Sequence, residues 1–393
     1  MSADRRDARQ PPRVLIVIGQ LDVGGAERHV AQIAPALRAR GIDVSIFTLK
    51  PGGALAAAVA AAGVPVLAHL ERKRGLRGLL QAALRLAGLA RRERYDIVHF
   101  FLPAAYLVGV CATWALPVRR VMSRRSLARY QARYPGVRLL ERLLHRRMDC
   151  VLANSRAVAR ELATEGMPLD RLGLVYNGVI DRTQGIARDA ARAALRLPAD
   201  VLVFAMIANL IPYKGHGDLL HALAQASARL PSGWTMLLVG RDDGIGLSLR
   251  EEARRLRLDG HLRWLGALDD VGPVLAAADI GVLCSHEEGF SNAVLEGMAA
   301  GLPMIVTDVG GNAEAVIDGV CGRVIPAHVP AALAAALTEL AASPADRARM
   351  GEAARARAAQ SFTVEACVAQ YELLYRNLVA GVTPPLPPAA FNI

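Results

Sequence analysis

Short apolar runs alternate along the first half of the chain with longer amphipathic stretches. The runs are rich in Val, Ile and Leu and lack a polar residue at every second position, which is typical of strands buried on both faces of a parallel sheet. A helix is predicted over Gly24–Arg40, directly after the first run. The predicted strands are Val14–Ile18, Val44–Leu49, Val64–Leu67, Ile97–Phe101, Val118–Met122, Cys150–Ala153 and Leu172–Val175.

The same pattern starts again in the second half. Its predicted strands are Val201–Ile207, Met236–Val239, Leu262–Leu265, Ile280–Leu283, Met304–Val306 and Gly322–Ile325. Two successive series of strands and helices predict an α/β protein with two Rossmann-like, doubly wound domains. We expect an N-terminal domain over 1–180, a polar linker over 181–199, a second domain over 200–361, a helix over 362–380 and a loose tail over 381–393.

Composition and cysteine usage narrow the setting. The chain has 393 residues, 53% of them hydrophobic, which is enough for two large cores. Its five cysteines occur singly, so neither a disulfide framework nor a zinc motif is indicated. Residues 1–12 lack the apolar core of a signal peptide. The longest apolar stretch, Leu102–Val118, is short for a membrane span and predicts a buried helix. These features favour a cytoplasmic protein.

Charge is distributed unevenly. Residues 1–180 hold 29 Lys and Arg against 13 Asp and Glu, whereas residues 181–393 hold 18 against 23. A basic half is consistent with a nucleic acid, an anionic membrane face or a phosphorylated substrate, or simply with solvated arginine-rich helices. No nucleic-acid recognition motif accompanies the charge, so nucleic acid is the least favoured partner.

Ligands of doubly wound sheets bind beyond the carboxyl ends of the strands. In two such domains the cleft between them is the expected site. The first motif at such an end is Gly24-Gly25-Ala26-Glu27. Its glycines allow close approach of the backbone, and the helix N-terminus offers N–H groups to a diphosphate or a sugar. The motif is not GxGxxG, so it does not indicate a dinucleotide.

Two further motifs follow strands of the second domain. Lys214 lies in Asn209–Gly217 at the start of a predicted helix, where a cation opposes the helix dipole unless it meets an anionic ligand. The segment from Glu288 to Glu296 contains Gly289 for a sharp turn and Ser291 as a helix cap. Its two carboxylates are suited to accepting hydrogen bonds from sugar or ribose hydroxyls.

Other chemistries are poorly supported. The chain has no GxSxG, HExxH or Walker A motif, and its nine histidines do not cluster at metal-ligand spacing. His99, near the end of the strand Ile97–Phe101, is the histidine best placed for catalysis, although a lone histidine is more often structural.

Together these motifs resemble the retaining glycosyltransferases of the family-4 type, also called group 1, whose architecture is GT-B. The resemblance runs from about Val14 to Tyr375. Its most specific part is the pair Glu288 and Glu296 with seven residues between them, and the other matching motifs fall in the family's order: Gly24-Gly25-Ala26-Glu27, Asn177-Gly178-Val179, Pro212 with Lys214-Gly215, and Gly310-Gly311 with Glu314.

The resemblance implies roles for these residues. Lys214 would stabilise the leaving diphosphate, Glu296 would hold the ribose, and Glu288 would contact the donor sugar. The backbone amides of Phe290, Ser291 and Asn292 would bind phosphate, Gly24 and Gly25 would approach the donor from the first domain, and the helix over 362–380 would cross back to that domain. Such enzymes need no metal or other cofactor, because protein dipoles and cations take that role.

Two positions depart from the family's pattern. Asn209 stands where many relatives have an arginine, so one phosphate contact is lost or supplied elsewhere. Ser123-Arg124-Arg125 lies where many relatives carry a histidine beside the acceptor, so Arg124 or Arg125 takes its place in this reading.

We therefore expect a retaining glycosyltransferase that moves a sugar from a UDP- or GDP-sugar to a glycan or lipid-linked acceptor, in surface polysaccharide, lipopolysaccharide or glycolipid synthesis. The candidate catalytic residues are Glu288, Lys214, Arg124 and His99. The alternatives are a non-catalytic sugar-binding subunit and a sugar-nucleotide epimerase on the same fold. The basic half, including Arg72-Lys73-Arg74 and the arginines from Arg119 to Arg147, is expected to contact the anionic inner membrane face.

Overall fold

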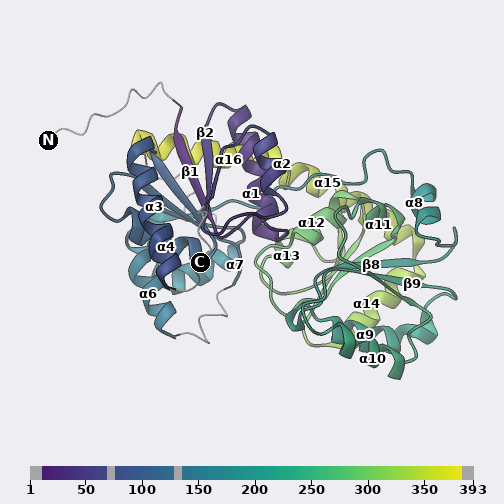
Figure 1. The fold of residues 1–393 in the computed structure, drawn as a ribbon. Helices are drawn as coiled ribbons and strands as arrows, with labels where there is room; N and C mark the ends of the chain where they lie inside the picture. The colour runs from purple at the N-terminus through teal and green to yellow at the C-terminus, as the bar shows by residue number, and fades with distance from the viewer. Residues whose placement is uncertain (1–10, 69–75, 128–134, 383–393) are drawn as a thin grey trace. The chain divides into compact units, whose positions relative to one another are not determined.

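A computed structural model describes residues 11–68, 76–127 and 135–382. The chain divides into two compact units, each with its own parallel sheet (Figure 1). The first unit contains the residues up to Gly178 and those from Val364 onward, and the second contains Val179–Thr363. The prediction of two doubly wound α/β domains is therefore confirmed.

The sheet of the first unit has seven parallel strands in the order β3-β2-β1-β4-β5-β6-β7. The order runs outward in both directions from the pair β1 and β4, which is the doubly wound topology. The strands are β1 (Arg13–Ile18), β2 (Asp43–Thr48), β3 (Val66–Ala68), β4 (Ile97–Phe101), β5 (Arg119–Arg124), β6 (Cys150–Ala153) and β7 (Leu172–Leu174).

Helices cover both faces of this sheet. Along β1, Val14 and Ile16 face a core shared with α1 and α16, whereas Leu15 and Val17 face a second core on the other side. This arrangement explains why the strand carries no polar alternation. The helices are α1 (Gly25–Ala39), α2 (Ala56–Ala61), α3 (Leu76–Glu93), α4 (Pro103–Thr113), α6 (Pro135–His145), α7 (Arg156–Thr164), the 3₁₀ turn η1 (Leu169–Arg171) and α16 (Val364–Ala380).

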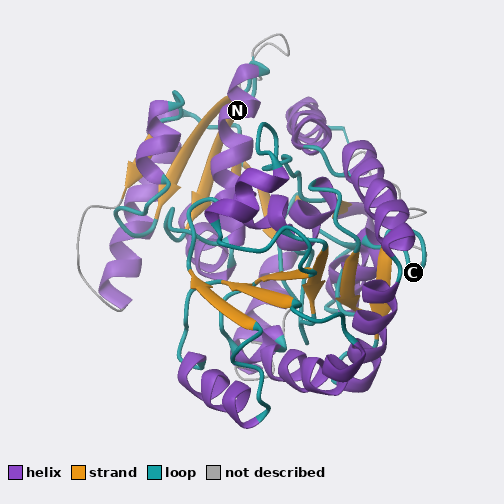
Figure 2. Cartoon of the chain, turned by 90° about the vertical axis from the view of Figure 1, so that its right-hand side faces the viewer, coloured by secondary structure: helices purple, strands orange, loops and turns teal. Residues whose placement is uncertain are grey.

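The second unit repeats the design with six parallel strands in the order β10-β9-β8-β11-β12-β13. Its strands are β8 (Val203–Ile207), β9 (Thr235–Val239), β10 (Leu262–Gly266), β11 (Ile280–Leu283), β12 (Met304–Thr307) and β13 (Gly322–Ile325). Its helices are α8 (Arg188–Ala194), α9 (His216–Ala226), α10 (Gly246–Arg255), α11 (Gly272–Ala277), α12 (Asn292–Ala299), α13 (Asn312–Ala315), α14 (Pro330–Ala342) and α15 (Pro344–Ser361), with 3₁₀ turns η2 (Pro212–Lys214) and η3 (Ser227–Arg229). Figure 2 shows the strands enclosed by helices.

The segment 181–199, predicted as a polar linker between the domains, belongs instead to the second unit. It forms α8, which packs on α11 in the second unit. The side chain of Arg192 is only 3% exposed, and its Nη2 lies 2.8 Å from Oδ2 of Asp279. A polar sequence was the only sign of a linker, and polarity alone does not show that Arg192 is buried.

The apolar stretch Leu102–Val118 contains α4, whose Tyr106 and Val110 are fully buried. It is therefore a core helix, as predicted. Within the described ranges no helix has the length and apolarity that crossing a bilayer requires. The basic triplet Arg72-Lys73-Arg74 lies outside the described residues, and so does most of the tail over 381–393.

Candidate functional site

Lys214 and Glu288, predicted to act on the same ligand, are in direct contact. The Nζ of Lys214 lies 2.6 Å from Oε1 of Glu288, and both side chains are largely buried. The hydroxyl of Ser285 donates a second hydrogen bond to the same carboxylate oxygen, at 2.8 Å. A lysine held in this way keeps its remaining N–H donors for a further anion.

Glycine fixes the loop that carries Lys214. Lys214 is the last residue of η2. The next residue, Gly215, has a φ of +75°, in the left-handed region. A Cβ on Gly215 would lie 2.0 Å from the carbonyl oxygen of Cys284, so the loop packs too closely on the end of β11 for any other residue. Lys214, on the loop that follows β8, is thereby held next to the segment that carries Glu288.

A second glycine supports Glu288 from the other side. Gly310 follows β12 with a φ of +55°, and a Cβ there would lie 1.8 Å from the carbonyl oxygen of Glu288. The N–H of Gly311 donates to the carbonyl oxygen of Gly289 at 2.8 Å. The glycine pair found in the sequence therefore packs against the turn between Glu288 and Gly289.

The helix that follows begins where the sequence predicted. Ser291 is the N-cap residue of α12, and its Oγ accepts from the N–H of Val294 at 3.5 Å. Phe290 is buried and packs edge-on against Phe362, with ring centroids 5.3 Å apart. These contacts hold the first turn of α12, which contains Asn292, in a defined position next to Glu288. Phosphate binding by its amides stays a prediction.

Glu296 is paired with an arginine that the sequence analysis did not single out. The Nε of Arg182 lies 2.9 Å from Oε1 of Glu296, and the carboxylate side chain is 11% exposed. Arg182 falls in the segment interpreted as a linker, so nothing in the pattern marked it. Its pairing places a second cation beside the two-glutamate motif.

Asn209 makes a local contact in place of the family's arginine. Its Oδ1 accepts from the backbone N–H of Arg241 at 3.1 Å, which joins the loops that follow β8 and β9. The side chain of Arg241 is 59% exposed and lies 2.6 Å from Oδ1 of Asp243. Asn209 thus positions a neighbouring loop and adds no positive charge of its own.

In the first unit, Gly24 is the N-cap of α1 and Gly25 its first residue. A Cβ on Gly24 would lie 2.3 Å from Oε2 of Glu27, because that carboxylate folds back over the start of the helix. Burial raises the pKa of Glu27. The carboxyl group of Glu27 faces the start of the helix, where it can accept from sugar hydroxyls, and the ligand of this motif stays a prediction.

Arg124 lies in a buried ion-pair network, which argues against its predicted catalytic role. Its side chain is 2% exposed, and its Nη2 lies 3.3 Å from Glu141 and 3.1 Å from Glu165. His145 also hydrogen-bonds Glu165, at 3.1 Å. Burial alone would raise the pKa of Glu165, but the hydrogen bond from His145 and the charge of Arg124 lower it overall. Arg124 therefore has a structural role, as the cation that pairs with these two buried carboxylates.

Arg125 was the alternative to Arg124 for the role beside the acceptor. It is half-buried at the carboxyl end of β5, and its Nη2 donates to Oδ1 of Asn177 at 2.6 Å. Burial lowers the pKa of its guanidinium, and Tyr371, which hydrogen-bonds it, opposes that change. Arg124 is the last residue of β5 and is held by buried carboxylates, whereas Arg125 follows it beyond the carboxyl end of the strand, where ligands bind in such sheets.

His99 is a core residue, and this corrects its place among the catalytic candidates. It is the third residue of β4 and is fully buried. Its Nδ1 lies 2.7 Å from the hydroxyl of Tyr375, and its Nε2 lies 2.8 Å from Oγ of Ser123. Burial lowers the pKa of His99 to about 3, so the ring is neutral. With both nitrogens engaged, it has none left for an acceptor hydroxyl.

Comparisons with known proteins agree with this organisation. The family described as "Glycosyl transferases group 1" matches residues 187–357, and that described as "Glycosyltransferase Family 4" matches residues 23–182. A Catenulispora acidiphila protein named D-inositol 3-phosphate glycosyltransferase 2 is 31% identical over 405 residues, covering 92% of this chain and 95% of that protein. A Streptomyces scabiei D-inositol 3-phosphate glycosyltransferase is 31% identical over 377 residues, covering 86% and 83%.

Solved structures show the same fold. Anabaena Alr3699/HepE, in complex with UDP and glucose, superposes with a TM-score of 0.80 at 24% identity, covering 92% of this chain and 98% of that one. WaaG, a glycosyltransferase involved in lipopolysaccharide biosynthesis, superposes with a TM-score of 0.69 at 18% identity, covering 94% and 100%.

Proposed function

Because the chain belongs to the group 1 glycosyltransferases and has their GT-B architecture, we propose that it is a retaining, metal-independent enzyme. In this proposal it transfers a sugar from a UDP- or GDP-sugar to a glycan or lipid-linked acceptor at the inner face of a membrane. The main support for the proposal is the contact between Lys214 and Glu288. Glu296, which pairs with Arg182, lies on α12, the helix that follows Glu288.

Lys214 acts on the leaving group in this account. The bond between the anomeric carbon and the donor's diphosphate breaks, and its electron pair moves to the diphosphate oxygen. Lys214 stabilises that charge, because its ammonium has N–H donors beyond the one that meets Glu288. The acceptor oxygen bonds to the same face of the sugar, and its proton passes to the departing diphosphate, so configuration is retained.

Glu288 and Glu296 address hydroxyl groups. Glu288, held by Ser285 and Lys214, accepts from the donor sugar and offsets positive charge at the anomeric carbon. Glu296 accepts from the ribose diol, since one carboxylate can accept two hydroxyl donors at once. Arg182 positions Glu296 through the 2.9 Å contact and brings the positive charge that Asn209 lacks.

In this proposal Arg125 takes the acceptor-side role, for which Arg124 and Arg125 were both candidates. Its guanidinium lies beside Asn177, and fixed N–H donors of this kind suit an acceptor or donor phosphate. Divalent metal has no part in the transfer that we propose, since the cations Lys214 and Arg182 stand in its place. Turnover should accordingly need no added Mg²⁺ or Mn²⁺.

The acceptor class rests on a surface of the first unit. Helix α4 packs against both α3 and α6, which lie on the same side of that unit in Figure 1. Seven large apolar side chains on α3, on α6 and directly after α4 are 44–66% exposed: Leu79, Leu80, Leu84, Trp114, Leu139, Leu140 and Leu143. An exposed apolar group of this size marks a binding surface.

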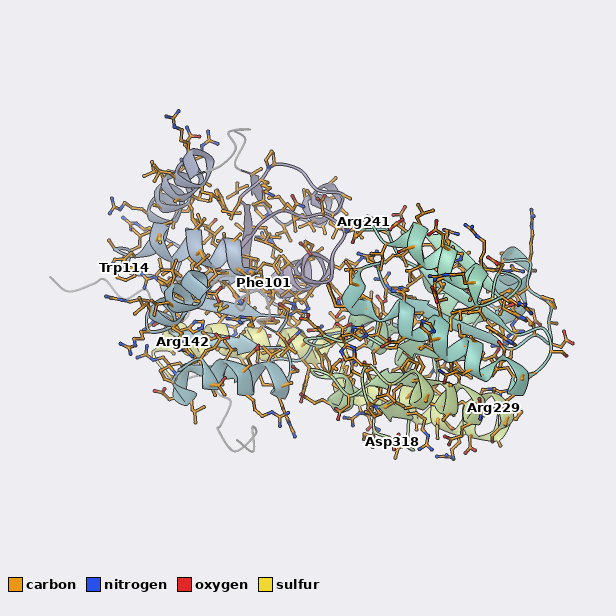
Figure 3. All side chains as sticks on the ribbon, turned by 90° about the horizontal axis from the view of Figure 1, so that it is seen from below. Phe101, Trp114, Arg142, Arg229, Arg241 and Asp318 are labelled. Atoms are coloured by element: carbon orange, nitrogen blue, oxygen red, sulfur yellow. The ribbon has the colours of Figure 1, made fainter. Side chains whose placement is uncertain are left out.

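Arginines accompany these apolar residues. Arg77, Arg85 and Arg146 are exposed on the same elements, and the guanidinium of Arg147 lies 4.1 Å from the ring centroid of Trp114. In Figure 3, Trp114 and Arg142 lie toward the periphery of the first unit. Exposed leucines beside arginines are the signature of an amphipathic surface that binds anionic lipid.

The names of the relatives support a second acceptor class, an inositol phosphate in solution. A panel that pairs UDP- and GDP-sugars with lipid-linked glycans and with inositol phosphates would decide between the two classes, read by nucleotide release and product mass. Transfer to a lipid-linked acceptor supports our proposal. Transfer only to inositol phosphate favours the relatives' substrate, and release of an isomerised sugar without any acceptor would indicate an epimerase.

A further inference from the structure

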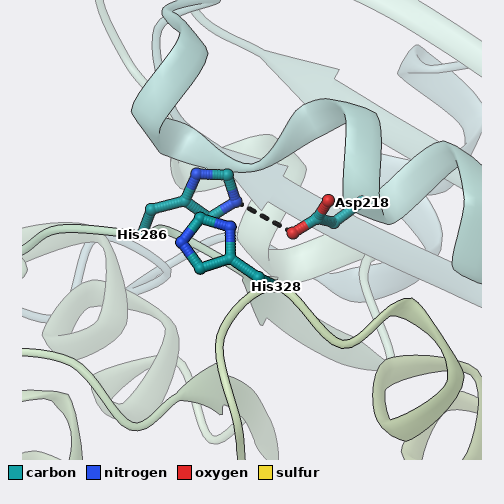
Figure 4. Close-up of side chains that lie close together, drawn as sticks. All are labelled: Asp218, His286 and His328. Carbon is teal, nitrogen blue, oxygen red and sulfur yellow. Dashed lines mark hydrogen bonds and ion pairs between the residues drawn. The ribbon is translucent and has the colours of Figure 1, made fainter.

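Two histidines and one aspartate come together in the second unit, although they are far apart in the sequence. Asp218 lies in the first turn of α9, His286 follows β11, and His328 precedes α14 (Figure 4). All three therefore lie at the carboxyl edge of the sheet. The spacing of histidines along the sequence gave no sign of this cluster, because each ligand comes from a different loop or helix.

The side chains converge at short range. The Nε2 of His286 lies 2.8 Å from Oδ2 of Asp218, and the rings of His286 and His328 have centroids 3.8 Å apart. One ligand atom from each residue lies within 4.8 Å of the others. In a tetrahedral zinc site with bonds of about 2.1 Å, ligand atoms are separated by about 3.4 Å. A side-chain adjustment of about 1.5 Å would thus complete the geometry.

The backbone at His328 is a second, independent observation. Its φ is +61°, in the left-handed region that a residue with a Cβ rarely adopts. Such conformations cost free energy and persist where the surrounding structure requires them, often at ligand sites. Asp218 alone would suffice to orient His286. It does not account for a second, exposed imidazole tilted against His286 on a residue with left-handed backbone.

The donor set selects the kind of metal. Two imidazoles and one carboxylate suit Zn²⁺ and similar divalent ions, whereas Mg²⁺ and Ca²⁺ prefer oxygen ligands throughout. We propose that Asp218, His286 and His328 form a binding site for a divalent cation of the zinc class, with water at the fourth position. This inference stands independently of the proposed function.

The site has a structural role. A metal there would join α9, the loop after β11 and the segment before α14. The backbone N–H of His286 also donates to the carbonyl oxygen of Tyr213 at 2.7 Å, directly beside Lys214. The cation would therefore stabilise the two loops that carry Lys214 and Glu288, without taking part in glycosyl transfer.

The test is metal binding by the full chain, with any affinity tag removed and bound metal stripped. We expect Zn²⁺ titration calorimetry to give one ion per chain, Co²⁺ to develop visible absorption bands, and Zn²⁺ to raise the melting temperature. His328→Ala should weaken Zn²⁺ binding by tenfold or more and remove the Co²⁺ bands. The matched control is His221→Ala, an exposed histidine whose Nε2 lies 3.5 Å from Glu252 but which belongs to no group of three such ligands in the described ranges.

The proposal is overturned if the wild-type chain binds no stoichiometric Zn²⁺, or if His328→Ala binds it as tightly as wild type. It is also overturned if His221→Ala loses binding to the same extent as His328→Ala. A chain that binds Zn²⁺ at this site but transfers no sugar would leave the inference standing and refute the proposed function alone.

Discussion

The ammonium of Lys214 and the carboxylate of Glu288 meet at 2.6 Å, although 74 residues separate them in the chain. Each charge is neutralised by the other in the absence of substrate. A bound donor diphosphate must therefore compete with Glu288 for Lys214. When Lys214 contacts the diphosphate, the carboxylate of Glu288 can accept from the sugar. The pair links two elements that the sequence marked separately.

Arg182 should act through Glu296. We expect Glu296→Ala to lower kcat/KM for the donor by about 100-fold and Arg182→Ala by about 10-fold, because a charge-assisted pair positions the carboxylate. The double variant should resemble Glu296→Ala alone, since residues in contact are not additive. Donor kinetics of the three variants measure this. Arg188→Ala, which removes an arginine paired with Asp279 in the same unit, is the control. Fully additive effects would contradict the role given to Arg182.

Substitution of Arg124 should mainly lower stability, whereas substitution of Arg125 should mainly lower activity. Arg124→Ala leaves Glu141 and Glu165 buried without their cation, so we expect a loss of about 3–5 kcal/mol in the free energy of unfolding. Arg125→Lys should keep the melting temperature near that of wild type and lower the rate of transfer. Denaturant unfolding together with an activity assay separates the two. A stable but inactive Arg124→Ala would restore Arg124 as a catalytic residue.

Much of the fold follows from the sequence alone. Every predicted strand is present within about two residues, because uninterrupted apolar runs such as Val14–Ile18 are unambiguous when both faces of a sheet are buried. The second domain's site motif was also recognisable, since Gly289 and Ser291 mark a turn and a helix cap by their chemistry.

What the sequence could not give was the burial of polar side chains. Arg124, Arg192 and His99 each resemble a surface or functional residue in one dimension. Each is buried by partners that come from distant segments: Glu165, Asp279 and Tyr375. Arg182 was missed because its partner Glu296 lies 114 residues away in the sequence. His99 did carry one usable signal, because the middle of a buried strand is a poor position for a catalytic group.

The neutral His99 should make stability depend on pH. Its pKa falls from an ordinary value near 6.5 to about 3 in the folded chain, so the unfolded state binds the proton more readily. The stabilisation is complete above about pH 6.5 and is lost as pH falls toward 3. We expect the melting temperature to drop across this window, and His99→Gln to drop less steeply than wild type. An identical slope for His99→Gln and for the exposed-site control His221→Gln would contradict this account.

The apolar surface of the first unit should bind anionic vesicles. Leu80→Glu combined with Leu143→Glu should reduce co-sedimentation with such vesicles by at least fivefold, because charged side chains do not enter the lipid interface. Binding by wild type should also weaken with salt, since the arginines contribute electrostatically. The control is Leu247→Glu, at a leucine of the second unit that is 69% exposed. Vesicle binding that survives the double substitution would place the contact elsewhere.

Nucleotide release tests the assignment of Glu288–Glu296 as the donor site. Wild type should release UDP or GDP from a matching nucleotide sugar in the presence of acceptor. Glu288→Gln should release it at least 100-fold more slowly, because the amide carries no charge to offset the developing cation. Glu287→Gln, at the adjacent residue, should stay within about twofold of wild type. Release by Glu288→Gln at the wild-type rate would contradict the assignment of this segment as the donor site.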